Sequence, residues 1–141
     1  MEMFSLKLEQ CKLKMKIYIA ASFTSRPRLR PIRDRLWEFG HEVTSTWLDE
    51  VAKPENMTGN EFFKKLAIKD ISELKSANLV IVDLLDPSTS GGRDTELGIA
   101  LGSFASKQIY LVGKPTSVFH QLVDQTFENW DGCLEVLKET T

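Results

Sequence analysis

The chain alternates short apolar segments with longer amphipathic ones along its length, and this alternation constrains the fold more than any other feature. The apolar segments have the length of buried strands, and the clearest of them spans residues 78–83 (NLVIVD). Strands that alternate with helices form a parallel sheet with helices on both of its faces. The sequence therefore predicts an α/β protein, a single doubly wound domain, flavodoxin-like or Rossmann-like, with a sheet of roughly five parallel strands.

The boundaries of the expected elements follow from hydrophobic spacing and from helix start and stop signals. We expect strands at residues 16–21, 41–46, 78–83, 107–112 and 126–128. We expect helices at residues 26–39, 58–76, 93–106 and 130–138, with Asn129 as the N-cap of the last one. The second of these helices has an apolar face formed by Phe63, Ala67, Ile71, Leu74 and Ala77. Residues 1–14 are expected to be a poorly specified leader, and residues 15–141 the domain.

The scarce residue types exclude several chemistries. The chain has only two histidines and two cysteines, and His41, His120, Cys11 and Cys133 lie far apart. No zinc-site spacing and no Ser/His/Asp or Cys/His set is present, so we expect no metal and no cofactor. Isolated cysteines without a signal peptide indicate a cytoplasmic protein. Proton transfer and nucleophilic attack are therefore expected to come from carboxylates.

Charge and hydropathy exclude two classes of partner. The net charge is −2, whereas a protein that binds polymeric nucleic acid usually carries a basic excess. No apolar run approaches the roughly 20 residues of a membrane-spanning helix. We therefore expect neither polymeric nucleic acid nor a membrane as partner.

The expected topology also locates a binding site. Ligands of doubly wound sheets bind at the carboxyl ends of the strands, where the strand order reverses. In a flavodoxin-like order the loops at that point are residues 21–26 and 84–92, and both are rich in small hydroxyl residues or glycine. The chain has no G-x-G-x-x-G motif after its first strand and no Walker A motif, so classical dinucleotide binding is disfavoured.

Two carboxylates near these loops require an explanation. Asp70 lies on the apolar stripe of the second helix, where a carboxylate is costly unless it is paired, hydrogen-bonded or protonated. Glu96 falls in the first turn of the third helix, directly after a Gly-rich loop, which suits an ionised nucleophile. Both also have structural alternatives: a satisfied buried aspartate, and a glutamate that matches the helix dipole.

Four segments together resemble the nucleoside 2-deoxyribosyltransferase family, including its deoxynucleoside 5′-monophosphate N-glycosidase branch. They are residues 17–22 (IYIAAS), Lys69-Asp70 seven residues ahead of Ala77-Asn78, residues 92–98 (GRDTELG) and residues 107–112 (KQIYLV). The third segment matches the family's G-x-x-x-E-[LI]-G signature. The resemblance covers residues 16–139.

The resemblance implies a role for each matched position. Glu96 would attack the anomeric carbon and form a glycosyl-enzyme intermediate, and Asp70 would contact the sugar or help protonate the departing base. Tyr18 would orient Glu96 and crowd the 2′ position. Further positions are expected to bind substrate; from the matched loops these are Ser22, Ser90, Gly91 and Gly92. Family members form dimers or larger assemblies in which a neighbour completes the pocket, and Ser117 and His120 lie where that contribution is expected.

Other residues near the same loops are weaker candidates. Arg26 is close enough to the first loop to bind an anionic substrate, whereas the other arginines of the first helix are expected on a solvated face. Trp47, Asp49 and Phe23 lie on the binding side of the sheet, where an aromatic ring either stacks on a nucleobase or packs in the core. His120 either binds phosphate or caps a helix.

The sequence leaves the type of reaction open. Where classical transferases carry an Asp-rich stretch, this chain has residues 86–91 (DPSTSG), which are closer to the hydrolase branch. Transfer to a second base and hydrolysis of a monophosphate are therefore both open. The alternatives from other classes are a non-catalytic nucleotide-binding module on the same scaffold and a glycosidase that acts on a nicotinamide dinucleotide.

Overall fold

The protein is described by a computed structural model, which covers residues 14–50, 54–88, 90–103 and 106–139. Within that part of the chain, five parallel strands form one sheet in the order β2-β1-β3-β4-β5. The strands are β1 (Lys16–Ala20), β2 (Glu42–Val43), β3 (Leu79–Asp83), β4 (Gln108–Val112) and β5 (Gln125–Phe127). This order confirms the expected α/β class with its flavodoxin-like topology. The expected leader falls almost entirely outside the described residues.

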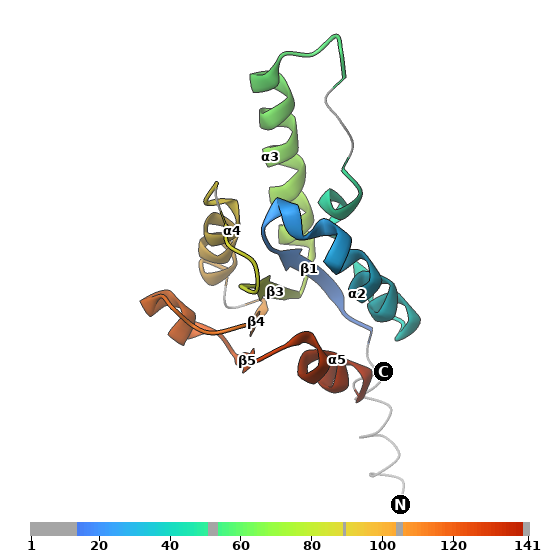
Figure 1. Ribbon diagram of the computed structural model, residues 1–141, viewed down its shortest axis with the longest axis vertical. Helices are drawn as coiled ribbons and strands as arrows, with labels where there is room; N and C mark the ends of the chain where they lie inside the picture. The colour runs from blue at the N-terminus through green and yellow to red at the C-terminus, as the bar shows by residue number, and fades with distance from the viewer. Residues whose placement is uncertain (1–13, 51–53, 89, 104–105, 140–141) are drawn as a thin grey trace, which may run out of the picture.

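Four α-helices cover the two faces of the sheet in pairs (Figure 1). Helices α2 (Arg26–Glu38) and α5 (Trp130–Glu139) contact each other on one face, and α3 (Gly59–Ser76) and α4 (Gly92–Leu101) contact each other on the other. Short 3-10 helices lie in three of the connections: η1 (Phe23–Ser25), η2 (Thr46–Asp49) and η3 (Val118–Leu122). The strand order reverses at β1 and β3, so the loops that follow these strands lie at the switch point.

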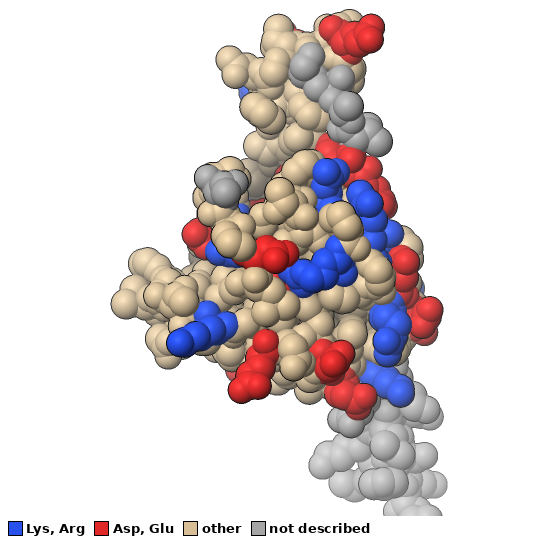
Figure 2. All heavy atoms as spheres, viewed as in Figure 1, with Lys and Arg blue, Asp and Glu red and all other residues tan. Residues whose placement is uncertain are grey.

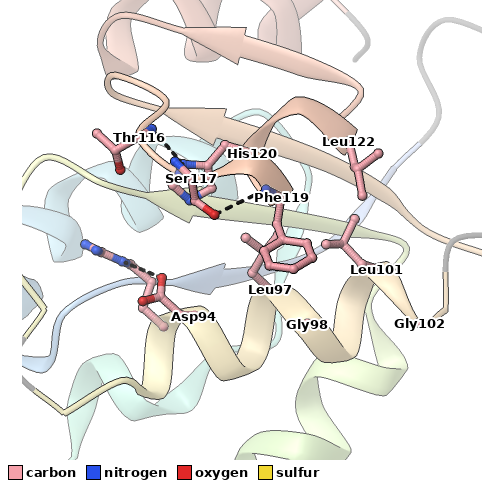
Figure 3. Close-up of a pocket in the computed structure, with 11 residues that line it drawn as sticks. Asp94, Leu97, Gly98, Leu101, Gly102, Thr116, Ser117, Phe119, His120 and Leu122 are labelled. Atoms are coloured by element: carbon pink, nitrogen blue, oxygen red, sulfur yellow. Dashed lines mark hydrogen bonds and ion pairs between the residues drawn. The ribbon is translucent and has the colours of Figure 1, made fainter.

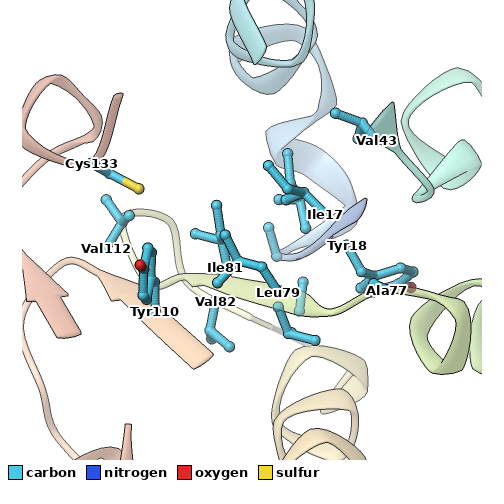
Figure 4. Packing of buried hydrophobic residues seen from close by; sticks show 14 of the residues in the cluster. Ile17, Tyr18, Val43, Ala77, Leu79, Ile81, Val82, Tyr110, Val112 and Cys133 are labelled. Atoms are coloured by element: carbon cyan, nitrogen blue, oxygen red, sulfur yellow. The ribbon is translucent and has the colours of Figure 1, made fainter. Parts of the chain in front are cut away.

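The central strands are buried on both sides, and alternate side chains point to opposite faces. Figure 4 shows Ile17 and Tyr18 pointing away from each other across β1. The register pairs Tyr18 with Val80 of β3, and both side chains are fully buried. Tyr18 interacts with side chains of α3 and α4, so it lies on the face that these two helices cover. A tyrosine hydroxyl is thereby placed inside an otherwise apolar layer.

Two expected elements are shorter in the structure. The second strand keeps only Glu42 and Val43, because the chain then bends into η2. Side-chain contacts stabilise that bend: the backbone N–H of Ile19 donates to Ser45 Oγ, and Thr46 donates to the carboxylate of Glu73. The third predicted helix ends at Leu101 rather than at residue 106.

The expected apolar face of α3 is only partly buried. Leu74 and Ala77 are buried, whereas Phe63 is 67% exposed and Ile71 is 37% exposed. Figure 1 shows the reason: α3 is long and projects beyond the rest of the domain, so only its C-terminal part packs on the sheet. The predicted apolar face is therefore part of the core only at the C-terminal end of α3. A capping box between Thr58 and Glu61 stabilises that free end.

Basic and acidic side chains are mixed on the surface. On the face seen in Figure 2, Lys and Arg side chains lie beside Asp and Glu side chains. None of the helices in the described ranges is long and apolar enough to cross a membrane. Among the same residues, no three His, Cys, Asp or Glu side chains are grouped so that they would hold a metal ion.

Candidate active site

Three ionisable side chains from three different elements interact beneath the switch point. They are Tyr18 of β1, Asp70 of α3 and Glu96 of α4. Within the described part of the chain, Tyr18 Oη, Asp70 Oδ1 and Glu96 Oε2 are buried oxygens without a hydrogen-bond partner. Buried polar atoms in proteins are nearly always hydrogen-bonded, and exceptions gather where a ligand or reaction uses them. The structure thus brings together the three side chains that the sequence singled out as catalytic candidates.

Burial is the largest cause of the shifted pKa of Glu96. It raises the pKa of the Glu96 carboxyl to about 8, and the negative charge of Asp70 adds to the shift. The Tyr18 hydroxyl acts in the opposite direction, because it lies close enough to donate toward the carboxylate and lowers the Glu96 pKa. The Tyr18 hydroxyl makes no full hydrogen bond, so its contact with the Glu96 carboxyl is a weak one.

The pKa values of Tyr18 and Asp70 are raised as well. Burial raises the pKa of the Tyr18 hydroxyl, and the neighbouring Glu96 carboxylate raises it further, so Tyr18 stays protonated. Burial raises the pKa of Asp70 to about 6; Lys69 opposes this shift, whereas Glu73 and Glu50 add to it. Between pH 6 and 8 the two carboxyls therefore hold about one proton, mainly on Glu96. The form with the proton on Asp70 and Glu96 ionised is the minor one, and it is the one that combines an acid with a nucleophile.

A small cavity of about 120 Å³ opens beside Asp70 at the carboxyl end of the sheet. Both loops of the switch point line it, as their composition led us to expect. The lining residues that the sequence predicted are Ser22, Phe23, Trp47, Asp70, Ser90 and Gly92. Those that it did not predict are Ala21, Glu50, Leu66, Ser88 and Arg93.

Two aromatic rings form one side of this cavity. The rings of Phe23 and Trp47 lie 6.4 Å apart between centroids, tilted by 32°. Trp47 is anchored from behind, because its Nε1–H donates to the carbonyl of Ile19 at 2.8 Å. Arg26 does not line the cavity; its guanidinium lies 3.7 Å from the centre of the Phe23 ring and donates to the Glu50 carbonyl. Phe23 itself is half exposed, so a planar ligand has access to it.

A glycine turn places Glu96 behind the cavity. Gly91 precedes α4 with a φ of +76°, a left-handed conformation that glycine adopts without strain. The chain turns there from the Ser-rich loop into the helix, and the hydroxyl of Thr95 donates back to the Gly91 carbonyl at 3.0 Å. Glu96 lies in the second turn of α4, on the side that faces Tyr18, and not in the first turn as the sequence led us to expect; the acidic residue of the first turn is Asp94.

Five of the candidate substrate-binding residues do not line the small cavity: Arg26, Asp49, Gly91, Ser117 and His120. Asp49 points to the surface, where Arg33 donates to it at 2.7 Å and lowers its pKa. Ser117 and His120 line a separate, larger cavity of about 710 Å³ between α4 and η3 (Figure 3). Arg93 lines both cavities, so the two adjoin.

The larger cavity is mainly apolar, and His120 lies at its polar end. His120 Nδ1 accepts hydrogen bonds from the backbone N–H groups of Thr116 and Ser117 (Figure 3). Burial lowers the pKa of His120, and Arg93 lowers it further against the opposing charge of Asp94. These contacts hold the ring as the neutral tautomer with its proton on Nε2. His120 is thus a hydrogen-bond donor at this cavity rather than a base.

The sequence did not identify those cavity residues whose position depends on how distant segments fold together. Glu50 follows the candidate Asp49, yet only the fold shows that Glu50 lines the cavity while Asp49 does not. Ser88 and Arg93 lie within the loop and signature already quoted, so the hydroxyl content of that loop was the available signal for Ser88. Leu66 carried no such signal, since its helical spacing is that of an ordinary apolar residue.

Among the comparisons with known proteins, the one with solved structures found matches, and these support the fold. No protein-family model and no curated protein matches the chain. A 2-deoxyribosyltransferase from the psychrotolerant bacterium Bacillus psychrosaccharolyticus has a TM-score of 0.65 and 20% identity, covering 84% of this chain and 90% of its own. The chain has the fold of that enzyme.

Two further structures agree with this assignment. The CMP N-glycosidase BcmB of Clostridium botulinum has a TM-score of 0.54 and 19% identity, covering 86% of this chain and 97% of its own. A conserved protein of Enterococcus faecalis V583 has a TM-score of 0.67 and 13% identity, covering 92% of this chain and 100% of its own. At these identities the comparison establishes the flavodoxin-like fold, and the function has to be argued from the site.

Proposed function

We propose that this protein cleaves or transfers the N-glycosidic bond of 2′-deoxynucleosides or their 5′-monophosphates, with Glu96 as the nucleophile. The observation that carries the proposal is the buried group of Tyr18, Asp70 and Glu96, which has an oxygen without a protein partner on each side chain and reaches the cavity through Asp70. Two structures that share the fold, a 2-deoxyribosyltransferase and a CMP N-glycosidase, support the proposal.

In the first step the Glu96 carboxylate attacks C1′ of the sugar as the bond from C1′ to the base nitrogen breaks. The transition state resembles an oxocarbenium ion, which a nearby carboxylate stabilises. The reactive form is the minor one in which the shared proton is on Asp70 and Glu96 is ionised, and Asp70 gives that proton to the departing base. Tyr18 donates toward the Glu96 carboxylate and keeps it aligned, and its buried ring leaves little room at C2′.

In the second step an acceptor attacks C1′ of the glycosyl ester from the opposite side. Water gives hydrolysis, whereas the nitrogen of a second base gives transfer; in either case the acceptor's proton passes to the Asp70 carboxylate, and Glu96 is released. Both steps invert C1′, so the product retains its original configuration. Phe23 and Trp47 would hold the base by stacking, and the hydroxyls of Ser22 and Ser90 with the backbone of Gly91 and Gly92 would face the 5′ end.

One experiment separates the candidate reactions. The purified protein is incubated with a panel of deoxynucleosides, their 5′-monophosphates and a nicotinamide dinucleotide, with and without an acceptor base, and the products are separated by chromatography. Base release without an acceptor indicates a hydrolase, and exchange only with an acceptor indicates a transferase. Thermal stabilisation by a nucleotide without any released base would instead indicate a binding module, and free nicotinamide would indicate the other glycosidase class.

The proton shared by the carboxyl pair predicts the dependence of activity on pH. Below about pH 6 both Asp70 and Glu96 are protonated and the nucleophile is lost; above about pH 8 both are ionised and the acid is lost. We therefore expect a plot of kcat/KM against pH to be bell-shaped, with an acid limb near pH 6 and an alkaline limb near pH 8, whichever carboxyl carries the proton. Initial rates from pH 5 to 9 at constant ionic strength measure it, and a flat profile over this range contradicts the paired mechanism.

We further propose that the working unit is a homodimer in which Ser117 and His120 of one copy reach the neighbouring site. The support is the apolar cavity along α4, together with the exposed side chains of η3: Val118 is 77% exposed and Leu122 is 64% exposed. Sedimentation velocity should show a dimer, and Leu122→Glu should yield a monomer with reduced turnover. A wild-type monomer with full turnover contradicts this assembly.

A further inference from the structure

The arginines of α2 do more than form a solvated face, which is what the sequence led us to expect of all but Arg26. Arg30 donates to the carbonyl of Leu48 at 2.8 Å, and Arg33 pairs with Asp49 at 2.7 Å. Arg28 makes the most extensive contacts, because its guanidinium reaches two carboxylates at once. These partners lie in segments far from α2 in the sequence, so the arginines tie loops to the helix.

The first carboxylate that Arg28 binds is that of Asp83, which is buried in the core. Asp83 ends β3 and is 1% exposed. Arg28 Nη1 and Nη2 donate to its two oxygens at 2.9 and 3.0 Å, and Trp130 Nε1 donates to Asp83 Oδ2 at 2.6 Å. The backbone N–H of Leu85 donates to Asp83 Oδ1 at 2.9 Å. A bidentate, charge-assisted pair with further donors holds the guanidinium in one orientation.

The second carboxylate belongs to the loop that follows β3. Ser25 Oγ donates to Asp86 Oδ2 at 2.7 Å, and Arg28 Nη2 and Nε donate to the same oxygen at 2.9 and 3.2 Å. The hydrogen bond from Ser25 and the charge of Arg28 lower the pKa of Asp86. On the other side, Arg93 Nη1 donates to the backbone carbonyl of Asp86 at 2.8 Å. Asp86 is therefore held by α2, by η1 and by α4.

These contacts join the two walls of the small cavity. Ser22 and Phe23, on one wall, lie within three residues of Ser25; Ser88, on the other, lies two residues after Asp86. Neither Arg28 nor Asp86 lines the cavity. The hydrogen bond between Ser25 and Asp86 spans 61 positions of sequence and crosses the switch point. It fixes the spacing of two loops between which the described residues make no backbone hydrogen bond.

We propose that Arg28 and Asp86 are positioning residues: they latch the loop of residues 84–88 to η1 and so set the width of the substrate cavity. This inference rests on the proposed function in one respect, namely that the cavity binds the nucleoside. Asp70 stands on α3, away from the latch. Glu96 stands on α4, which meets the latch through Arg93 at the backbone carbonyl of Asp86, a contact that a change of the Asp86 side chain leaves in place. Loosening the latch should therefore weaken substrate binding more than it slows the chemical step.

The test compares Asp86→Ala and Asp86→Asn with a matched control, Asp34→Asn. Asp34 is also an aspartate paired with an arginine of α2, but its partner Arg33 lies away from the cavity. We expect Asp86→Ala to raise KM roughly tenfold with kcat within about twofold of wild type, because the walls lose their fixed spacing. Asp86→Asn retains an acceptor for Ser25 and should recover part of the loss. The control should leave both constants unchanged.

A measurement without substrate separates failure of this inference from failure of the proposed function. Amide hydrogen exchange of the ligand-free protein should become faster in Asp86→Ala both at Leu85 and at Ser25, whose N–H donates to the Ser22 carbonyl. The sheet amides should keep their protection. Unchanged exchange at Ser25 overturns the latch, as does a fall in kcat at constant KM or a loss of protection throughout the domain. If the wild-type protein releases no base, the proposed function fails and the exchange result alone decides the latch.

Discussion

Glu96→Gln is expected to lower the rate of base release by a factor of about 10³ or more, because an amide is neither a nucleophile toward C1′ nor a carboxylate that stabilises the oxocarbenium-like state. The substitution preserves the size of the side chain and its position behind the glycine turn. The measurement is the single-turnover rate of base release, followed by chromatography at the pH where the wild-type enzyme is most active.

The variant should remain folded, which makes the result interpretable. Burial raises the pKa of Glu96 to about 8, so at pH 7 the wild-type carboxyl is largely protonated and a neutral amide of the same shape replaces it without a new buried charge. The midpoint of thermal unfolding should therefore stay at or above the wild-type value. Glu135→Gln on the exposed side of α5 is the matched control and should keep full activity. Substantial turnover in Glu96→Gln contradicts the assignment of the nucleophile.

The parallel sheet was predictable because the pattern that encodes it is local. β3 is a run of five buried residues that ends in Asp83, and alternating strands and helices leave few ways to connect them. Asp70 was identifiable for a related reason: a carboxylate on an apolar stripe conflicts with its surroundings, and such conflicts gather at functional sites. Tyr18 was different. Nothing in its spacing separates it from a core aromatic, and only the resemblance to a family pointed to it.

What the sequence did not reveal depends on distances between segments. The periodicity of α3 marks one apolar stripe, yet it carries no information on where the sheet stops, and Phe63 lies beyond that limit. The arginines of α2 look alike in the sequence; which carboxylate each one meets is decided by how the loops after β2 and β3 fold over the helix. Asp86 is the clearest case, because its partners Ser25 and Arg28 lie 61 and 58 positions away.

Asp70→Asn is expected to lower kcat by a factor of about 10² to 10⁴, the usual contribution of a positioned general acid. Asparagine keeps the shape of the side chain but cannot donate a proton to the departing base. The loss should be largest for bases that leave poorly as anions and smaller for a base that leaves readily without protonation. Comparing kcat for two nucleosides whose bases differ in this respect measures the role of the proton itself.

The pH profile of the same variant separates an acid from a structural aspartate. In the wild-type pair the alkaline limb reports loss of the last shared proton, so without the Asp70 carboxyl this limb should disappear. The negative charge of Asp70 also raises the pKa of Glu96, so in the variant Glu96 should titrate below about 8; because burial is the larger cause of the shift, the acid limb should nevertheless lie above its wild-type position near pH 6. The expected profile is thus a single rise with pH to a plateau, at a lowered rate. A variant that retains the full bell, or that loses activity together with its cooperative unfolding transition, assigns Asp70 to the architecture of the site and leaves the protonation of the base to another group. Lys69, the residue before Asp70, is partly buried, and its ammonium lies 2.6 Å from Glu50. Its charge lowers the pKa of Asp70, so Lys69→Met should shift the wild-type acid limb to higher pH while the profile keeps its bell shape.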